Sequence, residues 1–66
     1  MDYLEIKQQL KKLKYGFKEI AHDGVIFLEK GSVKIYQNGV VWRKGKCIGQ
    51  FDGDYEKLNF WANDWV

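Results

Sequence analysis

The sequence predicts an α+β domain. An N-terminal amphipathic helix packs on a four- to five-stranded antiparallel β-meander, and a short helix or strand ends the chain. Apolar residues follow a helical spacing near the N-terminus, and turn dipeptides then recur at nearly even intervals. Between these dipeptides the chain is rich in β-branched and aromatic residues, which favour strands. Its 66 residues are expected to form a single small domain, 1–66.

A helix is expected from Asp2 to Tyr15. Its apolar side chains recur at spacings of three and four residues and so share one stripe, made of Tyr3, Ile6, Leu10, Leu13 and Phe17. Asp2 suits the N-cap position, with Glu5 three residues further on. Lysines near the end of the segment suit the helix dipole, and Gly16 is a typical residue to follow a helix.

The rest of the chain is divided by five turn dipeptides, namely Asp23-Gly24, Lys30-Gly31, Asn38-Gly39, Lys44-Gly45 and Asp52-Gly53. They predict strands over about 18–22, 25–29, 32–37, 40–44 and 46–51. Asn-Gly between two apolar runs is typical of a two-residue type I′ turn, which here would pair Ile35 with Trp42.

Two-residue turns at 30–31, 38–39 and 44–45 assign one apolar set to a single sheet face: Ile26, Leu28, Val33, Ile35, Val40, Trp42, Cys47 and Phe51. A two-residue turn at 23–24 would bring Glu19 to the same face, so a longer turn is expected there. The opposite face holds a second apolar set, Val25, Phe27, Tyr36, Val41 and Ile48. This second face is too apolar for a solvated one, so we expect the C-terminal segment or a partner to cover it.

The C-terminal segment, 54–66, is aromatic and acidic. A helix capped by Asp54 would place one stripe of side chains together, formed by Tyr55, Leu58, Ala62 and Trp65. Alternation of Leu58, Phe60 and Ala62 would also suit a strand.

Residue types that carry catalysis are scarce. Serine, histidine and cysteine occur once each, at Ser32, His22 and Cys47, and threonine is absent. No zinc-ligand spacing or phosphate-binding glycine loop occurs, and 52–56 lacks most ligands of a calcium loop. We therefore expect no enzymatic activity, no metal and no cofactor.

The cellular compartment is also suggested by composition. No apolar run approaches the roughly 20 residues of a membrane span. The N-terminus lacks the pattern of a signal peptide, and a single cysteine forms no disulfide within the chain. A cytoplasmic protein without membrane contact is the simplest interpretation.

A non-enzymatic protein-interaction module fits the surface chemistry best. Tryptophan, tyrosine and arginine are enriched at the energetic centres of interfaces. The predicted partner-binding residues are the C-terminal tryptophans and the acids around them: Asp54, Glu56, Trp61, Asp64 and Trp65. Such a segment would bind a basic surface, including one that otherwise binds nucleic acid. The chain is therefore interpreted as a small stoichiometric inhibitor or accessory protein, of the phage or mobile-element type, acting on a larger host protein or nucleoprotein.

Three alternatives stay open. Both tryptophans could instead fill the protein's own core. A single-stranded nucleic-acid-binding protein would use basic and aromatic residues of the second sheet face, which are Lys34, Tyr36, Arg43 and Lys46. A homodimer would use an edge strand or the second face, because small domains gain stability by association. The formal net charge of +2 is low for a nucleic-acid-binding protein.

Overall fold

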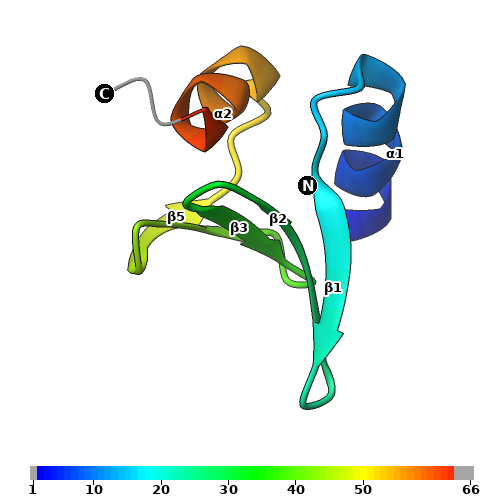
Figure 1. Cartoon of the computed structure of the whole chain (residues 1–66), viewed down its shortest axis with the longest axis vertical. Coiled ribbons are helices and arrows are strands. Elements are labelled where there is room, and N and C mark those ends of the chain that lie inside the picture. Colours follow the sequence, from blue (N-terminus) through cyan, green and yellow to red (C-terminus); the bar gives the residue numbers. More distant parts are fainter. Residues whose placement is uncertain (1, 64–66) are drawn as a thin grey trace.

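The computed structural model describes residues 2–63 and consists of two helices and one sheet (Figure 1). Along the chain these are α1 (Tyr3–Leu13), β1 (Lys18–His22), β2 (Val25–Lys30), β3 (Val33–Tyr36), β4 (Val40–Arg43), β5 (Lys46–Gln50) and α2 (Tyr55–Ala62). The strands form a five-stranded antiparallel sheet in the order β1-β2-β3-β4-β5. The predicted α+β meander is confirmed, and the C-terminal segment begins with a helix rather than a strand.

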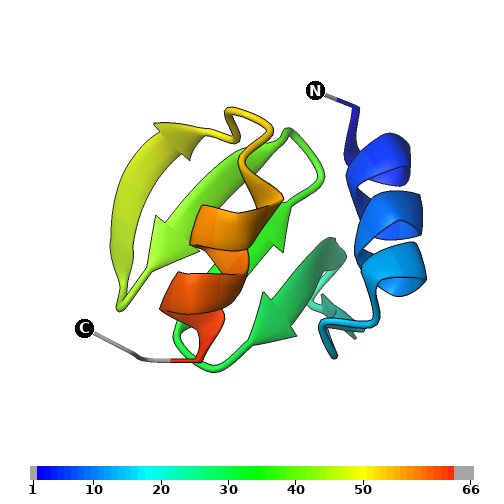
Figure 2. The same cartoon turned by 90° about the horizontal axis from the view of Figure 1, so that it is seen from above.

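Both helices lie on one side of the sheet, as Figure 1 shows from the side and Figure 2 from above. Their apolar side chains meet the sheet in one core whose members are at most 7% exposed: Ile6, Leu10, Leu28, Val33, Ile35, Val41, Phe51, Leu58 and Ala62. Since Leu58 and Ala62 belong to α2, this helix shares a sheet face with α1. The expectation that the C-terminal segment covers the second face is therefore wrong for the part of it that the structure describes.

Helix α1 begins and ends through local hydrogen bonds. The Asp2 carboxylate accepts a hydrogen bond from the Leu4 backbone N–H at 3.4 Å, as expected of an N-cap. At the other end Lys14 has a left-handed backbone with a φ of +58°, and its N–H donates to the Lys11 carbonyl at 3.2 Å. The helix thus ends at Leu13, two residues earlier than expected, because Lys14 already takes the left-handed cap conformation.

The loop between β3 and β4 is one residue longer than predicted. Ile35 pairs with Val41 instead of Trp42, which leaves a three-residue loop. The Gly39 N–H donates to the Tyr36 carbonyl at 2.9 Å, and Gly39 has a φ of +82°. A tight turn followed by one left-handed residue is a common three-residue hairpin loop. Because a shift of one residue exchanges the two sheet faces, Val41 enters the core and Trp42 faces the other side.

The β2–β3 turn also differs from the prediction. Lys30 pairs with Val33, so Gly31 and Ser32 form the turn, and Leu28 lies opposite Ile35. This is a shift of two residues in the pairing, which preserves the faces. The prediction that these apolar side chains point toward the core is therefore confirmed, although the predicted partners are wrong.

The first hairpin has the short turn that the sequence analysis disfavoured. His22 pairs with Val25, and both turn residues are left-handed, with φ of +53° at Asp23 and +78° at Gly24. Glu19 therefore does point to the helix side of the sheet, opposite Leu28. Glu19 lies in the edge strand of the sheet, where side chains of α1 bind its carboxylate.

Two side chains of α1 bind the Glu19 carboxylate. The Tyr3 hydroxyl donates to it at 2.9 Å, and the Lys7 ammonium lies 3.0 Å from the same oxygen. The hydrogen bond from Lys7 is the main reason why the pKa of Glu19 is lowered. Burial, with the hydrogen bond to Glu19, raises the pKa of Tyr3 to about 12. Glu19, which was not expected on the core face, thus attaches α1 to the edge strand β1.

The β4–β5 hairpin combines a correct turn with an irregular strand. Arg43 pairs with Lys46 and Trp42 with Cys47, as a two-residue turn at 44–45 requires. A bulge between Val41 and Trp42 then shifts the register, so that Val40 pairs with Gln50. Cys47 is exposed, and the expectation that it lies in the core is wrong because Trp42, its cross-strand neighbour, faces away from the helices.

Candidate functional site

The sheet face that neither helix covers is the candidate functional site. The strand register places three cross-strand rows of side chains on it: His22 with Val25; Ile20 with Phe27 and Tyr36; and Lys18 with Glu29, Lys34, Trp42 and Cys47. These rows are called the open face below. It keeps Val25, Phe27 and Tyr36 of the predicted second face, and the one-residue shift in β4 adds Trp42 and removes Val41. The expectation that Ile48 lies on this face is wrong, because Ile48 lines a pocket with Val41 and Trp61 on the helix side.

Three aromatic rings form a continuous cluster at the centre of the open face. The rings of Phe27 and Tyr36 are stacked, with centroids 5.2 Å apart and planes 16° from parallel. The Trp42 ring follows at 6.2 Å from Tyr36 with its plane tilted by 43°. Cross-strand aromatic pairs of this kind stabilise a sheet by roughly 0.2–1 kcal/mol each. We call Phe27, Tyr36 and Trp42 the ring cluster.

The row beside the ring cluster carries two lysines and one glutamate. Glu29 lies between two lysines in its row, paired in register with Lys18 on one side and Lys34 on the other. The Lys34 ammonium is 3.8 Å from the Glu29 carboxylate and 5.5 Å from the centroid of the Phe27 ring. Lys34 therefore contributes to a weak ion pair and a cation–π contact, and the open face presents mainly apolar surface.

The predicted nucleic-acid-binding residues are divided between the two faces. Lys34 and Tyr36 lie on the open face. Arg43 and Lys46 pair with each other one position along from Trp42 and Cys47, so strand alternation assigns them to the helix side. Arg43 confirms this placement, because its guanidinium lies 5.1 Å from the ring centroid of Trp61 in α2.

The predicted tryptophan anchor at Trp61 contacts the protein itself. Two cations lie over its ring, the Arg43 guanidinium at 5.1 Å and the Lys57 ammonium at 5.2 Å from the centroid. It is partly buried against the core. Within residues 2–63 the Arg43 Nε is buried without a hydrogen-bond partner, which is consistent with a guanidinium held by ring contact. Trp65 and Asp64, the other predicted anchors, lie outside the described residues.

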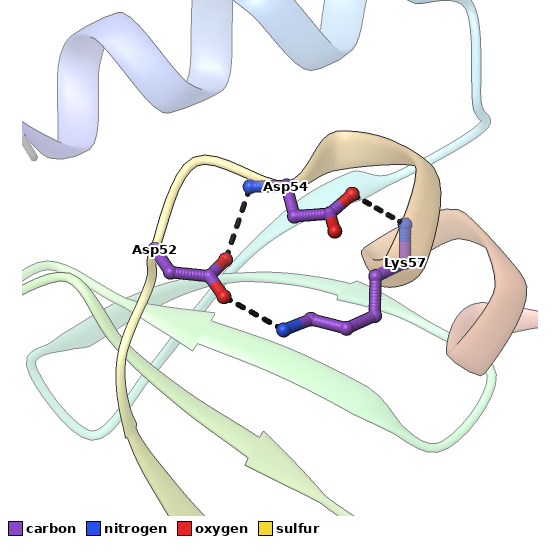
Figure 3. Close-up of polar contacts among 3 residues, drawn as sticks. All are labelled: Asp52, Asp54 and Lys57. Carbon is purple, nitrogen blue, oxygen red and sulfur yellow. Dashed lines mark hydrogen bonds and ion pairs between the residues drawn. The ribbon is translucent and has the colours of Figure 1, made fainter.

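The acidic residues before α2 are occupied in starting that helix (Figure 3). Asp54 is the N-cap, and its carboxylate accepts a hydrogen bond from the Lys57 backbone N–H at 3.0 Å. Asp52 accepts hydrogen bonds from the Asp54 backbone N–H at 3.0 Å and from the Lys57 ammonium at 2.6 Å. The bond to Lys57 lowers the pKa of Asp52 and raises that of Lys57. Of the predicted binding acids that the structure describes, Asp54 is used locally and Glu56 is exposed.

Neither a metal centre nor a membrane-spanning helix is found in the described part of the chain. Among residues 2–63, no group of three or more His, Cys, Asp or Glu side chains is arranged to hold a metal ion. No helix within the same residues is long and apolar enough to cross a membrane.

Comparison with known proteins gives no assignment: no protein-family model matches the chain, and no significant match occurs among curated proteins or solved structures. The site is therefore interpreted from its own chemistry. Sequence reasoning missed Trp42 as a surface residue, since a two-residue loop at Asn38-Gly39 would bury it. No signal in the Asn-Gly dipeptide distinguishes a two-residue loop from a three-residue one.

Proposed function

We propose that this protein is a non-enzymatic protein-interaction module that binds a partner protein through its open face. The observation that supports the proposal most strongly is the ring cluster on a sheet face without a covering helix. Trp42 there is 36% exposed, whereas Val41, the residue before it, is 2% exposed in the core. An apolar, aromatic surface left open by the fold is typical of an interaction site.

The geometry of the ring cluster favours a protein partner over a single nucleic-acid strand. Bases bind by stacking on an exposed ring face. Phe27 and Tyr36 turn their faces toward each other, so that each ring has at least one face occupied. The cations for phosphate contact are also few, since Lys34 has a carboxylate nearby and Arg43 belongs to the other side of the sheet.

Binding through pre-packed rings has a low entropic cost. Side chains that are loose in the free protein must be ordered on association, at about 0.5–1.5 kcal/mol each. Tyr36 is held between Phe27 and Trp42 before any partner arrives. We propose that the protein acts stoichiometrically, as an inhibitor or accessory factor that occupies a mainly apolar surface of a larger protein.

The single cysteine offers a direct test. Cys47 is exposed and lies opposite Trp42 in the open face, so a photo-activated crosslinker attached to it samples what binds there. The matched control carries the crosslinker on α2, in a Cys47→Ser/Glu56→Cys variant, because Glu56 is exposed on that helix. Both labelled proteins are irradiated in lysate of the cells that produce the protein.

The proposal expects one-to-one protein adducts from the Cys47 probe and not from the control, and their loss in a Trp42→Ser variant. Adducts that disappear on nuclease treatment would support the nucleic-acid alternative instead of a protein partner. Adducts of twice the chain mass would indicate the homodimer instead. Equal labelling from both probes, or none from Cys47, would contradict binding at the open face.

A further inference from the structure

A second surface, on the helix side of the sheet, combines apolar and basic side chains. Between α1 and the first hairpin lies a groove of about 430 Å³, which is within the usual size range of ligand sites. Its floor is apolar, with Leu10 from α1, Phe17 from the segment before β1 and Leu28 from β2. We call it the α1 groove.

Lysines dominate the rim of the α1 groove. Lys7, Lys11 and Lys14 line it, and Glu19 is the one acid among its lining residues. The Glu19 carboxylate already binds Lys7 and the Tyr3 hydroxyl. Within residues 2–63, no carboxylate lies within ion-pair distance of Lys11 or Lys14.

A fourth ammonium lies near the end of the groove at Gly16. A side-chain carbon added at Gly16 would be 3.9 Å from the Lys30 Nζ. Among residues 2–63, Lys30 donates to a neutral partner, the Asn59 side-chain oxygen at 3.5 Å. Among the described residues, four lysine ammonium groups therefore lie around the apolar floor, and Glu19 supplies the one carboxylate beside them.

Stabilisation of the α1 dipole does not by itself explain this arrangement. Cations in the last turn of a helix are favourable wherever they point, and Lys12 fulfils that role outside the groove. Lys11 and Lys14, in contrast, converge with Lys7 on an apolar floor. A ligand that matches both features carries negative charge beside an apolar group.

We propose that the α1 groove binds an acidic peptide segment of a partner protein that carries one large apolar side chain. The apolar side chain packs on Phe17, above the nearly buried Leu10 and Leu28, and flanking carboxylates pair with Lys11 and Lys14. A phosphate backbone would use the lysines but leave the apolar floor exposed, which is why a peptide is the better fit. This site is independent of the open face, and either can fail without the other.

The test uses a defined probe, the capped peptide Glu-Glu-Trp-Leu-Glu-Glu, titrated into isotope-labelled protein and followed by NMR. Two peptides separate the contributions, one with glutamine for glutamate and one with serine for Trp and Leu. The protein variants are Lys11→Gln, Lys14→Gln and the double variant. Lys12→Gln is the matched control, since Lys12 lies in the same helical turn but outside the groove.

The proposal expects peptide-induced shifts at Leu10, Phe17 and Leu28. Affinity should fall about threefold in each single variant and about tenfold in the double variant, as expected for exposed ion pairs. Lys12→Gln should bind like the unmodified protein, and both altered peptides should bind at least tenfold more weakly.

Three results would overturn the proposal. Shifts confined to other surfaces would place the peptide elsewhere. Equal binding of the serine peptide, or of a thymidine oligonucleotide, would make the groove a general polyanion site. Growth of the apparent mass with concentration, with shifts in the groove before peptide is added, would make a second copy of the chain the occupant.

Discussion

The two faces of the sheet carry large apolar side chains in different states. On the helix side Ile35 is fully buried and Val41 is 2% exposed, beneath side chains from both helices. On the open face Trp42, next to Val41 in the chain, is 36% exposed and contacts another ring of the same face. Hydrophobicity alone therefore does not separate residues that hold the fold from residues available to a partner. The strand register separates these two groups, because it decides on which face each side chain lies.

The two faces also differ in composition. The covered face is mainly aliphatic, and its core includes residues of α1 and α2 as well as of the sheet. The open face has a stacked aromatic pair that neither α1 nor α2 covers. Removal of a side chain from the first face should cost folding free energy, whereas removal from the second should mainly cost binding.

The largest effect is expected for Ile35→Ala on the covered face. Truncation of a fully buried isoleucine removes apolar contacts and leaves a cavity, which costs about 2–5 kcal/mol. A domain of this size has a total stability of the order of 3–10 kcal/mol, so much of the protein should unfold. Urea denaturation followed by circular dichroism measures the loss. A cost below about 1 kcal/mol would show that this face is not the main core.

Gly39→Ala tests the loop that determines which residues belong to which face. Gly39 has a φ of +82°, and a left-handed backbone costs a side-chain-bearing residue roughly 1–2 kcal/mol. We expect a loss of stability of that size in urea denaturation. Gln37→Ala is the control, because Gln37 is exposed in the same loop and has no positive φ. Equal stability of the two variants would contradict the three-residue loop.

The sequence allowed the elements to be predicted because each has a local cause. The apolar stripe near the N-terminus, the Asp2 cap and the regular Gly-containing turns all act within a few residues. The face assignment of Trp42 depended on a single residue of loop length, which local sequence does not encode. The position of α2 depended on which face the sheet left uncovered, a property of the whole fold.

The candidate site was predictable in kind but not in membership. Lys34 and Tyr36 were placed on the second face, and they do lie on the open face. Arg43 and Trp61 were assigned to separate binding sites, yet they contact each other on the helix side. Long side chains on neighbouring elements choose partners through tertiary packing, which the spacing of residues along the chain does not reveal.

Trp42→Ala should have a smaller effect on stability than either change above. Loss of one cross-strand aromatic pair costs roughly 0.2–1 kcal/mol, because the ring is already partly in water. Its effect on partner binding at the open face should be larger, since truncation of a tryptophan at the centre of an interface commonly costs 2 kcal/mol or more. Comparison of its urea midpoint with that of Ile35→Ala would test the distinction. Equal costs would mean that the open face is a second core.

The smallest expected effect concerns the rim of the covered face, where Glu19 attaches α1 to β1. Its pKa is lowered in the folded protein, chiefly by the hydrogen bond from Lys7, so its contribution to stability is present above its ordinary pKa of 4.5. That contribution should be lost as the pH falls below about 4.5 and Glu19 takes up a proton. The pKa of Asp52 is also lowered, so Asp52 loses its contribution to stability in acid in the unmodified protein and in Glu19→Gln alike. The difference in stability between these two proteins therefore isolates the contribution of Glu19. This difference should narrow in acid, whereas parallel curves from pH 7 to pH 3 would show that the carboxylate contributes nothing to the attachment of α1.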